Sequence, residues 1–257
     1  MDIHPTAIVH PGARLGEGVT VGAYSIIEDN VTVGAGTKIG PHVVIKRYSE
    51  IGRDCEIYQF ASIGEIPQDM KFGGEETKLI VGDRVRIREF VTLNRGTKGG
   101  GGETRIGDDC FILAYAHVAH DCIIEDNALI VNAVQMGGHV HIGRFAVVGG
   151  GSVLHQFIRI GAHSMIGGGS AVPQDVPPYT NVAGNRAELH GLNTVGLKRR
   201  GFSDEAISAL KKAYRIIFRS GLTVAESKAK VESDVARTPE VIELMDFVAG
   251  SERGVVR

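Results

Sequence analysis

The 257-residue sequence contains no tryptophan, and aromatic residues amount to only 6% of the chain. This scarcity fits neither an ordinary helical bundle nor an aromatic-rich sandwich. The three cysteines are too few for a disulfide framework and fit a reducing compartment. The net charge of −2 gives no reason to expect a nucleic-acid partner.

Long apolar runs are also missing. No stretch approaches the roughly 20 apolar residues of a membrane span. The segment Met1–Pro5 has neither the basic start nor the apolar core of a signal peptide. We therefore expect a soluble, cytoplasmic protein without stable membrane insertion.

Glycine, in contrast, is abundant with 35 residues, and an apolar residue recurs at every sixth position. The series runs from Ile3 to Ile63, resumes at Val81, and restarts one position out of phase from Ile106 to Val172. A period of six is neither helical nor a simple strand alternation. It is typical of a hexapeptide β-helix, in which three hexads form one coil of a triangular prism. Successive coils then stack ~4.8 Å apart.

Two further positions agree with the repeat. The residue two places before each apolar residue is usually small, as the narrow interior of a prism requires. Glycine, asparagine and aspartate follow the apolar residue, as tight corners require. The cysteines Cys55, Cys110 and Cys122 all occupy the small position. We therefore expect these cysteines to be buried packing residues and not reactive thiols.

The repeat divides the chain into two parts. We predict a mainly β chain, with a parallel β-helix over residues 1–183 and a small α-helical domain over residues 184–257. Two loop excursions, at residues 65–78 and 94–105, abandon the six-residue rule. Long loops that break a solenoid are often functional.

The last part of the chain indicates three helices. Ser203 is a suitable N-cap for a helix that ends at Gly221. A second helix is expected from Thr223 to about Arg237, and a third after Pro239.

Polar residues and glycine collect at one corner of the predicted prism, where residues 18 apart lie above one another. Two columns result, His120 with Gly138 and Gln156, and Asp121 with His139 and Phe157. A scaffold alone would be free to vary at these positions, so we interpret the corner as a catalytic centre. The stacked triplets Gly149–Gly151 and Gly167–Gly169 leave bare backbone, which suits either a groove for a long substrate or tight corners.

The histidines His117, His120 and His139 raise the alternative of a zinc site, as in histidine-rich prisms of the γ-carbonic anhydrase type. The closely spaced pair here is His-x-x-His, and a wider separation is expected for that kind of site. We predict no metal ion.

Several motifs together resemble one family, the UDP-N-acetylglucosamine O-acyltransferases that begin lipid A biosynthesis in Gram-negative bacteria. These motifs are Gln68–Lys71, His117–Cys122, Gly138–His139, His155–Phe157, Gln174–Tyr179 and Gly196–Phe202. The resemblance covers essentially the whole chain. It implies that the prism is a left-handed β-helix and that the protein is a homotrimer with active sites between subunits.

The resemblance also implies a reaction. An (R)-3-hydroxyacyl chain is transferred from acyl carrier protein to the 3-hydroxyl of UDP-N-acetylglucosamine. The chain travels on the phosphopantetheine of the carrier protein, so no further cofactor is expected. By resemblance, His120 is the general base and the backbone N–H of Gly138 binds the oxyanion.

The other site residues follow from the same resemblance. The sugar-nucleotide and donor sites are lined by Asp69, Lys71, His117, Asp121, His139, Gln156, Asn193, Arg199 and Arg200. Met165 and Gly168 belong to the acyl-chain groove, where glycine at position 168 admits a long chain. Taken alone, Asp69 and Lys71 are explained equally well as a solvated loop tip.

Two residues depart from the family pattern. Val195 stands where a glutamate is common, and Arg186 where a histidine is common. These departures leave the acceptor open. The alternative is an N-acyltransferase that acts on the 3-amino analogue of the sugar nucleotide and forms an amide.

Overall fold

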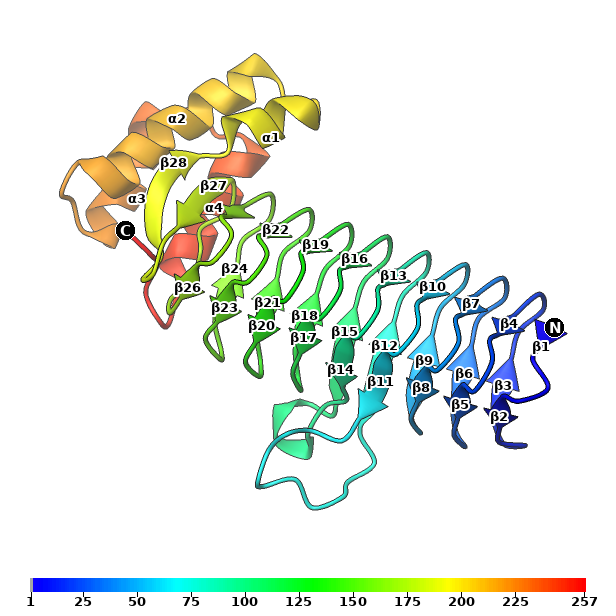
Figure 1. The fold of residues 1–257 in the computed structure, drawn as a ribbon. Coiled ribbons are helices and arrows are strands. Elements are labelled where there is room, and N and C mark those ends of the chain that lie inside the picture. The colour runs from blue at the N-terminus through cyan, green and yellow to red at the C-terminus, as the bar shows by residue number, and fades with distance from the viewer. Residues whose placement is uncertain (1) are drawn as a thin grey trace.

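Residues 18 apart in the sequence lie side by side, as the repeat predicts. The computed structural model describes residues 2–257. In it, Thr20 pairs with Lys38 and Lys38 with Glu56, always in parallel strands. The paired strands form the three faces of a prism that leads from the N-terminus to a group of helices (Figure 1). The predicted mainly β chain with a C-terminal helical part is confirmed.

The strands fall into three sheets, which the chain visits in turn. Sheet 1 contains β1 (Asp2–Ile3), β4 (Thr20–Val21), β7 (Lys38–Ile39), β10 (Glu56–Ile57), β13 (Arg86–Ile87), β16 (Phe111–Ile112), β19 (Leu129–Ile130), β22 (Val147–Val148), β25 (Met165–Ile166), β27 (Thr180–Ala183) and β28 (Glu188–Leu192). Sheet 2 contains β2 (Ile8–Val9), β5 (Ile26–Ile27), β8 (Val44–Ile45), β11 (Ser62–Glu65), β14 (Thr92–Asn94), β17 (His117–Val118), β20 (Gln135–Met136), β23 (Val153–Leu154) and β26 (Ala171–Val172). Sheet 3 contains β3 (Arg14–Leu15), β6 (Thr32–Val33), β9 (Ser49–Ile51), β12 (Lys78–Val81), β15 (Glu103–Ile106), β18 (Ile123–Ile124), β21 (His141–Ile142) and β24 (Arg159–Ile160).

The repeat residues fill the interior of the prism. Ile27, Ile45 and Ile63, at the same place in successive coils of sheet 2, are at most 1% exposed. Burying one such side chain is worth about 1.5–3 kcal/mol. Because every coil repeats this contribution three times, the stack needs no large aromatic core.

The small inward position is occupied as predicted, with Cys55, Cys110 and Cys122 all free and buried. The thiols also make hydrogen bonds that the sequence did not indicate. Cys110 Sγ donates to the Glu125 carbonyl oxygen at 3.2 Å, and Cys122 Sγ to the Gly137 carbonyl oxygen at 3.3 Å. Burial raises the pKa of both thiols to about 12, so they remain protonated.

Each corner contains two turn residues, and the second often has a left-handed backbone. Asn30 (φ 54°) and Asp109 (φ 56°) follow the expected turn chemistry. The expectation was incomplete, however, because aromatic residues also take this conformation. At the corner between sheets 1 and 2, five rings stack with centroids 4.8–5.2 Å apart: Tyr24, His42, Phe60, Phe90 and Tyr115. Stacking in this aromatic ladder offsets the cost of the left-handed backbone.

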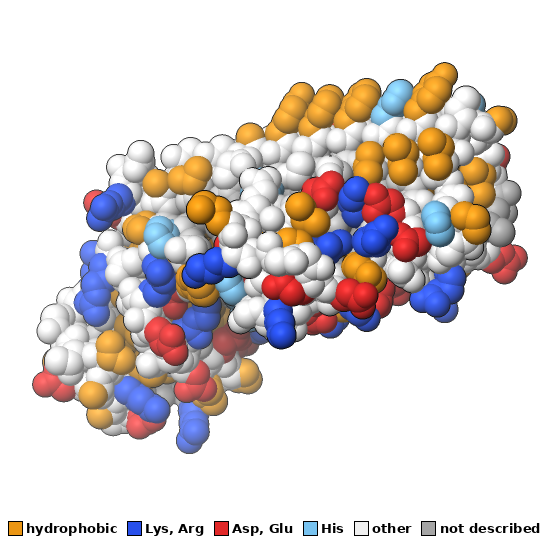
Figure 2. Space-filling model, turned by 90° about the horizontal axis from the view of Figure 1, so that it is seen from below, with side chains coloured by type: hydrophobic (Ala, Val, Ile, Leu, Met, Phe, Trp, Pro, Cys, Tyr) orange, Lys and Arg blue, Asp and Glu red, His pale blue; other side chains and the backbone are white. Residues whose placement is uncertain are grey.

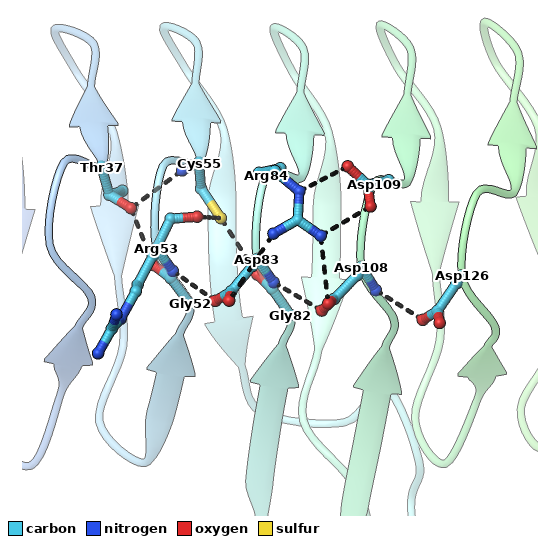
Figure 3. A network of polar contacts seen from close by, with 10 residues as sticks. All are labelled: Thr37, Gly52, Arg53, Cys55, Gly82, Asp83, Arg84, Asp108, Asp109 and Asp126. Carbon is cyan, nitrogen blue, oxygen red and sulfur yellow. Dashed lines mark hydrogen bonds and ion pairs between the residues drawn. The ribbon is translucent and has the colours of Figure 1, made fainter.

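A staircase of aspartates stabilises the corner between sheets 3 and 1 (Figure 3). The N–H of Arg53 donates to Asp83 Oδ1 at 2.7 Å, the N–H of Asp83 to Asp108 Oδ1 at 2.9 Å, and the N–H of Asp108 to Asp126 Oδ1 at 2.8 Å. The backbone N–H of the first turn residue at each of these corners therefore donates to an aspartate side chain of the next coil.

The two loop excursions lie against each other beneath β11 and β14 (Figure 1). Asn94 Nδ2 donates to the Ile66 carbonyl oxygen at 2.7 Å. The buried guanidinium of Arg95 lies 5.4 Å from the ring centre of Tyr48 and 5.5 Å from that of Phe72. Such cation–π contacts hold the two segments together.

A hairpin of β27 and β28 ends the prism, and four helices follow: α1 (Thr194–Arg199), α2 (Asp204–Arg219), α3 (Val224–Asp234) and α4 (Pro239–Ala249). Ser203 caps α2 and Thr223 caps α3, so the three predicted helices are confirmed. The short helix α1 was not expected. The hairpin crosses the expected boundary at residue 183, and the division into two domains stays a prediction. Among residues 2–257, no helix is long and apolar enough to cross a membrane.

Candidate active site

The predicted catalytic corner lies between sheets 2 and 3. His120, Gly138 and Gln156 are the first turn residues of three successive coils there. Asp121 and His139 follow as second turn residues with φ of 59° and 61°. The rings of His120 and His139 meet edge to face, with centroids 5.2 Å apart. The structure therefore brings the two polar columns together at one place.

His120 is held by the residue that follows it. Its Nδ1 lies 2.7 Å from Asp121 Oδ2, and the Asp121 side chain has no exposed surface. A carboxylate only accepts hydrogen bonds, so Nδ1 carries the hydrogen and Nε2 keeps a free lone pair. The Asp121 carboxylate is enclosed and contacts His120, and its place in a substrate site stays a prediction.

Gly138 lies against the His120 ring. It is buried, and a Cβ at this position would lie 2.5 Å from His120 Cε1. Within residues 2–257 its backbone N–H makes no hydrogen bond, whereas the matching N–H groups of Arg53, Asp83 and Asp108 donate to carboxylates. A free donor thus stands beside a histidine that can accept a proton.

Two further histidines surround this pair and favour their neutral forms. Burial, and then the nearby His120, lowers the pKa of His117, whose Nδ1 lies 2.7 Å from Thr92 Oγ1. Burial also lowers the pKa of His139, an effect that the charge of Asp121 opposes. Neutral imidazoles can donate one hydrogen bond and accept another, which suits contacts with an uncharged sugar.

Asp69, in the first excursion, acts electrostatically on this corner. Its carboxylate charge raises the pKa of His139 against the effect of burial. Asp69 Oδ1 accepts the N–H of Lys71 at 3.0 Å, which fixes the turn. The Lys71 side chain is exposed and makes no ion pair within the described chain.

Asn193, Arg199 and Arg200 lie elsewhere on the same chain. Asn193 caps α1, with its Oδ1 accepting from the Gly196 N–H at 3.1 Å. The guanidinium of Arg200 lies 4.3 Å from the ring centre of Phe145, which belongs to the corner between sheets 3 and 1. Arg199 is exposed in the last turn of α1. Within one chain, the structure does not bring these residues to His120.

The residues predicted to line the acyl-chain groove lie near the corner between sheets 1 and 2. Gly168 is exposed at the corner between sheets 1 and 2, directly above Gly150. Met165 is 39% exposed on the neighbouring face, sheet 1. The outer face of sheet 2 spans the distance from this corner to that of His120. A pocket of about 260 Å³ lies at its far end, lined by Val153, Leu154, His155, Ala171, Val172, Pro173, Asn185 and Arg186.

The same side chains contain a possible metal-ligand set. Ligand atoms of His120, Asp121 and His139 lie within 4.8 Å of one another. However, Asp121 already accepts three hydrogen bonds, one from His120 and two from Thr97. These hydrogen bonds fit an acid–base pair better than a metal centre, and the absence of a metal ion stays a prediction.

Sequence reasoning missed Thr97, which contacts Asp121, and Thr92, which contacts His117. Thr97 lies in an excursion, where the six-residue period assigns no position in space. Thr92 lies in β14, one coil before His117, but the excursion makes their separation 25 residues instead of 18. A count that allowed for the inserted residues would have found this contact.

Comparisons with known proteins agree over the whole chain. The family model described as Udp N-acetylglucosamine O-acyltransferase, domain 2, matches residues 175–256, and that described as bacterial transferase hexapeptide (six repeats) matches residues 12–47 and 103–138. The acyl-[acyl-carrier-protein]–UDP-N-acetylglucosamine O-acyltransferase of Thiobacillus denitrificans is 50% identical over 255 residues, 99% of each chain. That of Anaeromyxobacter dehalogenans is 51% identical over 257 residues, 100% of each chain.

Structural similarity is as extensive. The UDP-N-acetylglucosamine O-acyltransferase of Moraxella catarrhalis superposes with a TM-score of 0.97 at 44% identity, over 100% of both chains. Identity near one half along the whole length, together with the shared fold, leaves one conclusion. The chain belongs to the family of acyl-[acyl-carrier-protein]–UDP-N-acetylglucosamine O-acyltransferases.

Proposed function

We propose that the chain transfers an (R)-3-hydroxyacyl group from acyl carrier protein to the 3-hydroxyl of UDP-N-acetylglucosamine, the first step of lipid A biosynthesis, with His120 as general base. The observation that carries this proposal is the His120–Asp121 pair, 2.7 Å apart, beside the free N–H of Gly138. Family membership supplies the reaction, and this geometry supplies the groups that can perform it.

The acceptor hydroxyl is a poor nucleophile near neutral pH and needs a base. Nε2 of His120 takes its proton while the sugar oxygen attacks the thioester carbonyl carbon. The buried carboxylate of Asp121 stabilises the imidazolium that forms. The intermediate then collapses, the C–S bond breaks, and the imidazolium returns its proton to the leaving thiolate. The products are the sugar ester and the free phosphopantetheine thiol, so the proposed reaction uses no further cofactor.

The negative charge that develops on the carbonyl oxygen needs a donor. The N–H of Gly138 is free, and its Cα has no side chain to exclude a substrate from the His120 ring. Loss of one such donor typically costs about 10²–10³ in rate. In this proposal His117, His139, Gln156 and Asp69 bind the sugar and the donor around this centre.

We further propose a homotrimer whose active sites lie between neighbouring chains. His120 belongs to the corner between sheets 2 and 3, whereas Arg200 packs on Phe145 at the corner between sheets 3 and 1. If Asn193, Arg199 and Arg200 bind the nucleotide diphosphate or the acidic carrier protein, a second copy must supply them. Arginine suits either task, because its planar guanidinium pairs with phosphate and carboxylate oxygens.

The aromatic ladder supports such an assembly. Its aromatic members, Tyr24, Phe60, Phe90 and Tyr115, are 41–60% exposed. Figure 2 shows a row of hydrophobic side chains, interrupted by a histidine, along one edge of the prism. A continuous exposed row of this length is typical of a surface that another chain covers.

The acyl chain has a candidate path over the outer face of sheet 2. It would run from the His120 corner across Gln135 and Val153 toward Gly168 and the pocket beside Ala171. The bare backbone of Gly168 leaves this path open. We assign the reaction to the cytoplasm, where the buried free thiols of the prism stay reduced.

The 3-amino sugar nucleotide remains the second candidate acceptor, because Val195 is 60% exposed at the start of α1 and offers no charge or hydrogen bond there. A mass-spectrometric assay with 3-hydroxytetradecanoyl carrier protein and either acceptor tests this. Ester formation with UDP-N-acetylglucosamine supports the proposal. Product from the 3-amino analogue alone would move the acceptor to the second candidate and leave the base unchanged.

A further inference from the structure

We propose that Thr97 is a positioning residue that fixes Asp121 and, through it, the orientation of His120. The inference rests on the proposed role of His120 as general base. It also explains why an excursion interrupts the prism at residues 94–105. This segment supplies the groups that enclose the carboxylate beside the catalytic histidine.

Thr97 binds both oxygens of the Asp121 carboxylate. The Thr97 backbone N–H donates to Asp121 Oδ1 at 2.8 Å, and the Thr97 hydroxyl donates to Asp121 Oδ2 at 2.7 Å. Oδ2 is also the oxygen that accepts the Nδ1–H of His120. The Thr97 hydroxyl and the His120 ring therefore donate to the same carboxylate oxygen.

The direction of that hydroxyl is determined by a second contact. The N–H of Gly100 donates to Thr97 Oγ1 at 3.2 Å, so the oxygen is an acceptor on that side. Its own hydrogen is left for Asp121, and because a carboxylate only accepts hydrogen bonds, no other arrangement satisfies both groups.

The rest of the excursion closes over the carboxylate. A Cβ on Gly100 would clash with the Asp121 carboxyl group, so only a glycine permits this close approach. The Asp121 backbone N–H donates to Thr104 Oγ1 at 2.8 Å. Asp121 is thus bound at its N–H and at both carboxylate oxygens by two threonines of one segment, apart from its bond to His120.

This arrangement gives Thr97 a defined effect on the reaction. A buried carboxylate that accepts three hydrogen bonds keeps one orientation. Loss of the Thr97 hydroxyl would free Oδ2 to turn away from Nδ1, and the ring would lose its alignment toward the acceptor. Because Thr97 is buried, the loss should appear in kcat and leave KM unchanged.

A purely local role is the competing explanation, since Thr97 also caps the 3₁₀ turn η1 (Lys98–Gly100). The experiment compares Thr97→Val and Thr97→Ser in the full-length protein, each with and without Asp121→Asn. We expect Thr97→Val to lower kcat about tenfold with both KM values within about twofold, as for loss of one charge-assisted hydrogen bond. Thr97→Ser, which keeps the hydroxyl, should retain most of kcat.

The double variant separates the two explanations. If Thr97 acts through Asp121, Thr97→Val adds no further loss of kcat in the Asp121→Asn background. An equal additional loss in both backgrounds, or unchanged kcat in Thr97→Val alone, would overturn the proposal. If the valine variant does not fold, Thr97→Ala replaces it in the same cycle.

Thr77→Val is the matched control. Thr77 is buried at the end of the other excursion, and its hydroxyl has no hydrogen-bond partner in residues 2–257. The same substitution there should leave kcat unchanged. His120→Ala separates this inference from the proposed function: if it keeps full kcat, the general base is wrong. If it is inactive while Thr97→Val is fully active, only the role of Thr97 is wrong.

Discussion

A methyl group on the Cα of Gly138 would lie 2.5 Å from Cε1 of His120. Real side-chain contacts are never this close, so the two residues of neighbouring coils share a space that only glycine leaves open. The stack of coils creates this relationship, because 18 residues separate the two positions and one coil contains 18 residues.

Gly138→Ala should therefore lower kcat by at least about 10²-fold, because the ring must move away from its acceptor. The backbone N–H is retained and φ is not in the left-handed region, so the thermal midpoint should change little. The control is Gly99→Ala, where an added Cβ meets no atom within 4 Å. Steady-state kinetics measures the change in kcat, and a thermal melt measures the change in thermal midpoint. Similar kcat values in both variants would contradict the proposed contact.

Gly168→Met should shorten the preferred acyl chain. A side chain at this bare corner would project into the path proposed for the distal end of the acyl group, and its Cβ alone would lie 3.2 Å from the Gly150 carbonyl oxygen. Competition between carrier proteins loaded with shorter and longer 3-hydroxyacyl chains measures the preference by mass spectrometry. An unchanged product ratio would contradict the assignment of Gly168 to the acyl-chain groove.

His163 should make the folded protein sensitive to mild acid. Burial, and then the charges of Arg200 and Arg144, lowers its pKa to about 4 from its ordinary value of 6.5, while Glu243 opposes this. Between these two pH values the unfolded chain binds more protons. The stability that the neutral imidazole contributes is therefore complete above pH 6.5 and is lost as the pH falls to about 4. It amounts to about 3 kcal/mol.

The variant His163→Phe tests this pH dependence. It keeps a ring between Phe145 and Tyr179, which stack on His163 with centroids 4.9 and 5.7 Å away. The drop in thermal midpoint between pH 7.5 and pH 5 should be smaller in the variant than in the natural protein. Equal drops in the two proteins would show that another group carries the acid sensitivity.

Phe90→Asp should weaken the proposed homotrimer. Phe90 stacks between Phe60 at 5.0 Å and Tyr115 at 4.8 Å in the aromatic ladder, so a buried charge there would face the neighbouring chain. Sedimentation velocity should show a smaller species than in the natural protein. Ile242→Asp, at an exposed position of α4, is the control and should sediment like the natural protein. If Phe90→Asp sediments like the natural protein, the ladder is not the interface.

The period of six was sufficient to predict the prism, the buried cysteines and the corner at which His120, Gly138 and His139 meet. The period allowed these predictions because each hexad forms one face of a coil. The position of a residue in the repeat therefore gives its position on the prism. The helices after Ser203 were also predictable, since their caps are local signals.

Contacts made by residues outside the six-residue repeat could not be predicted from the sequence. Thr97 and Asp69 lie in excursions, and neither the contact of Thr97 with Asp121 nor the effect of Asp69 on the pKa of His139 follows from any period. The enclosure of Asp121 was missed for the same reason. Arg200 packs on Phe145 at a different corner of the chain from His120, so its predicted place in a substrate site depends on the assembly, which the period does not give.

The proposed base is tested most directly by the turnover of His120→Ala. We expect the variant to keep the oligomeric state of the natural protein and to lose about 10²–10⁴ in kcat for acyl transfer to UDP-N-acetylglucosamine, because His120 is the imidazole that Asp121 holds beside the free N–H of Gly138. The measurement is product formation by mass spectrometry over the full pH range in which the protein is folded. A variant that keeps the natural turnover would contradict the assignment of His120 as general base.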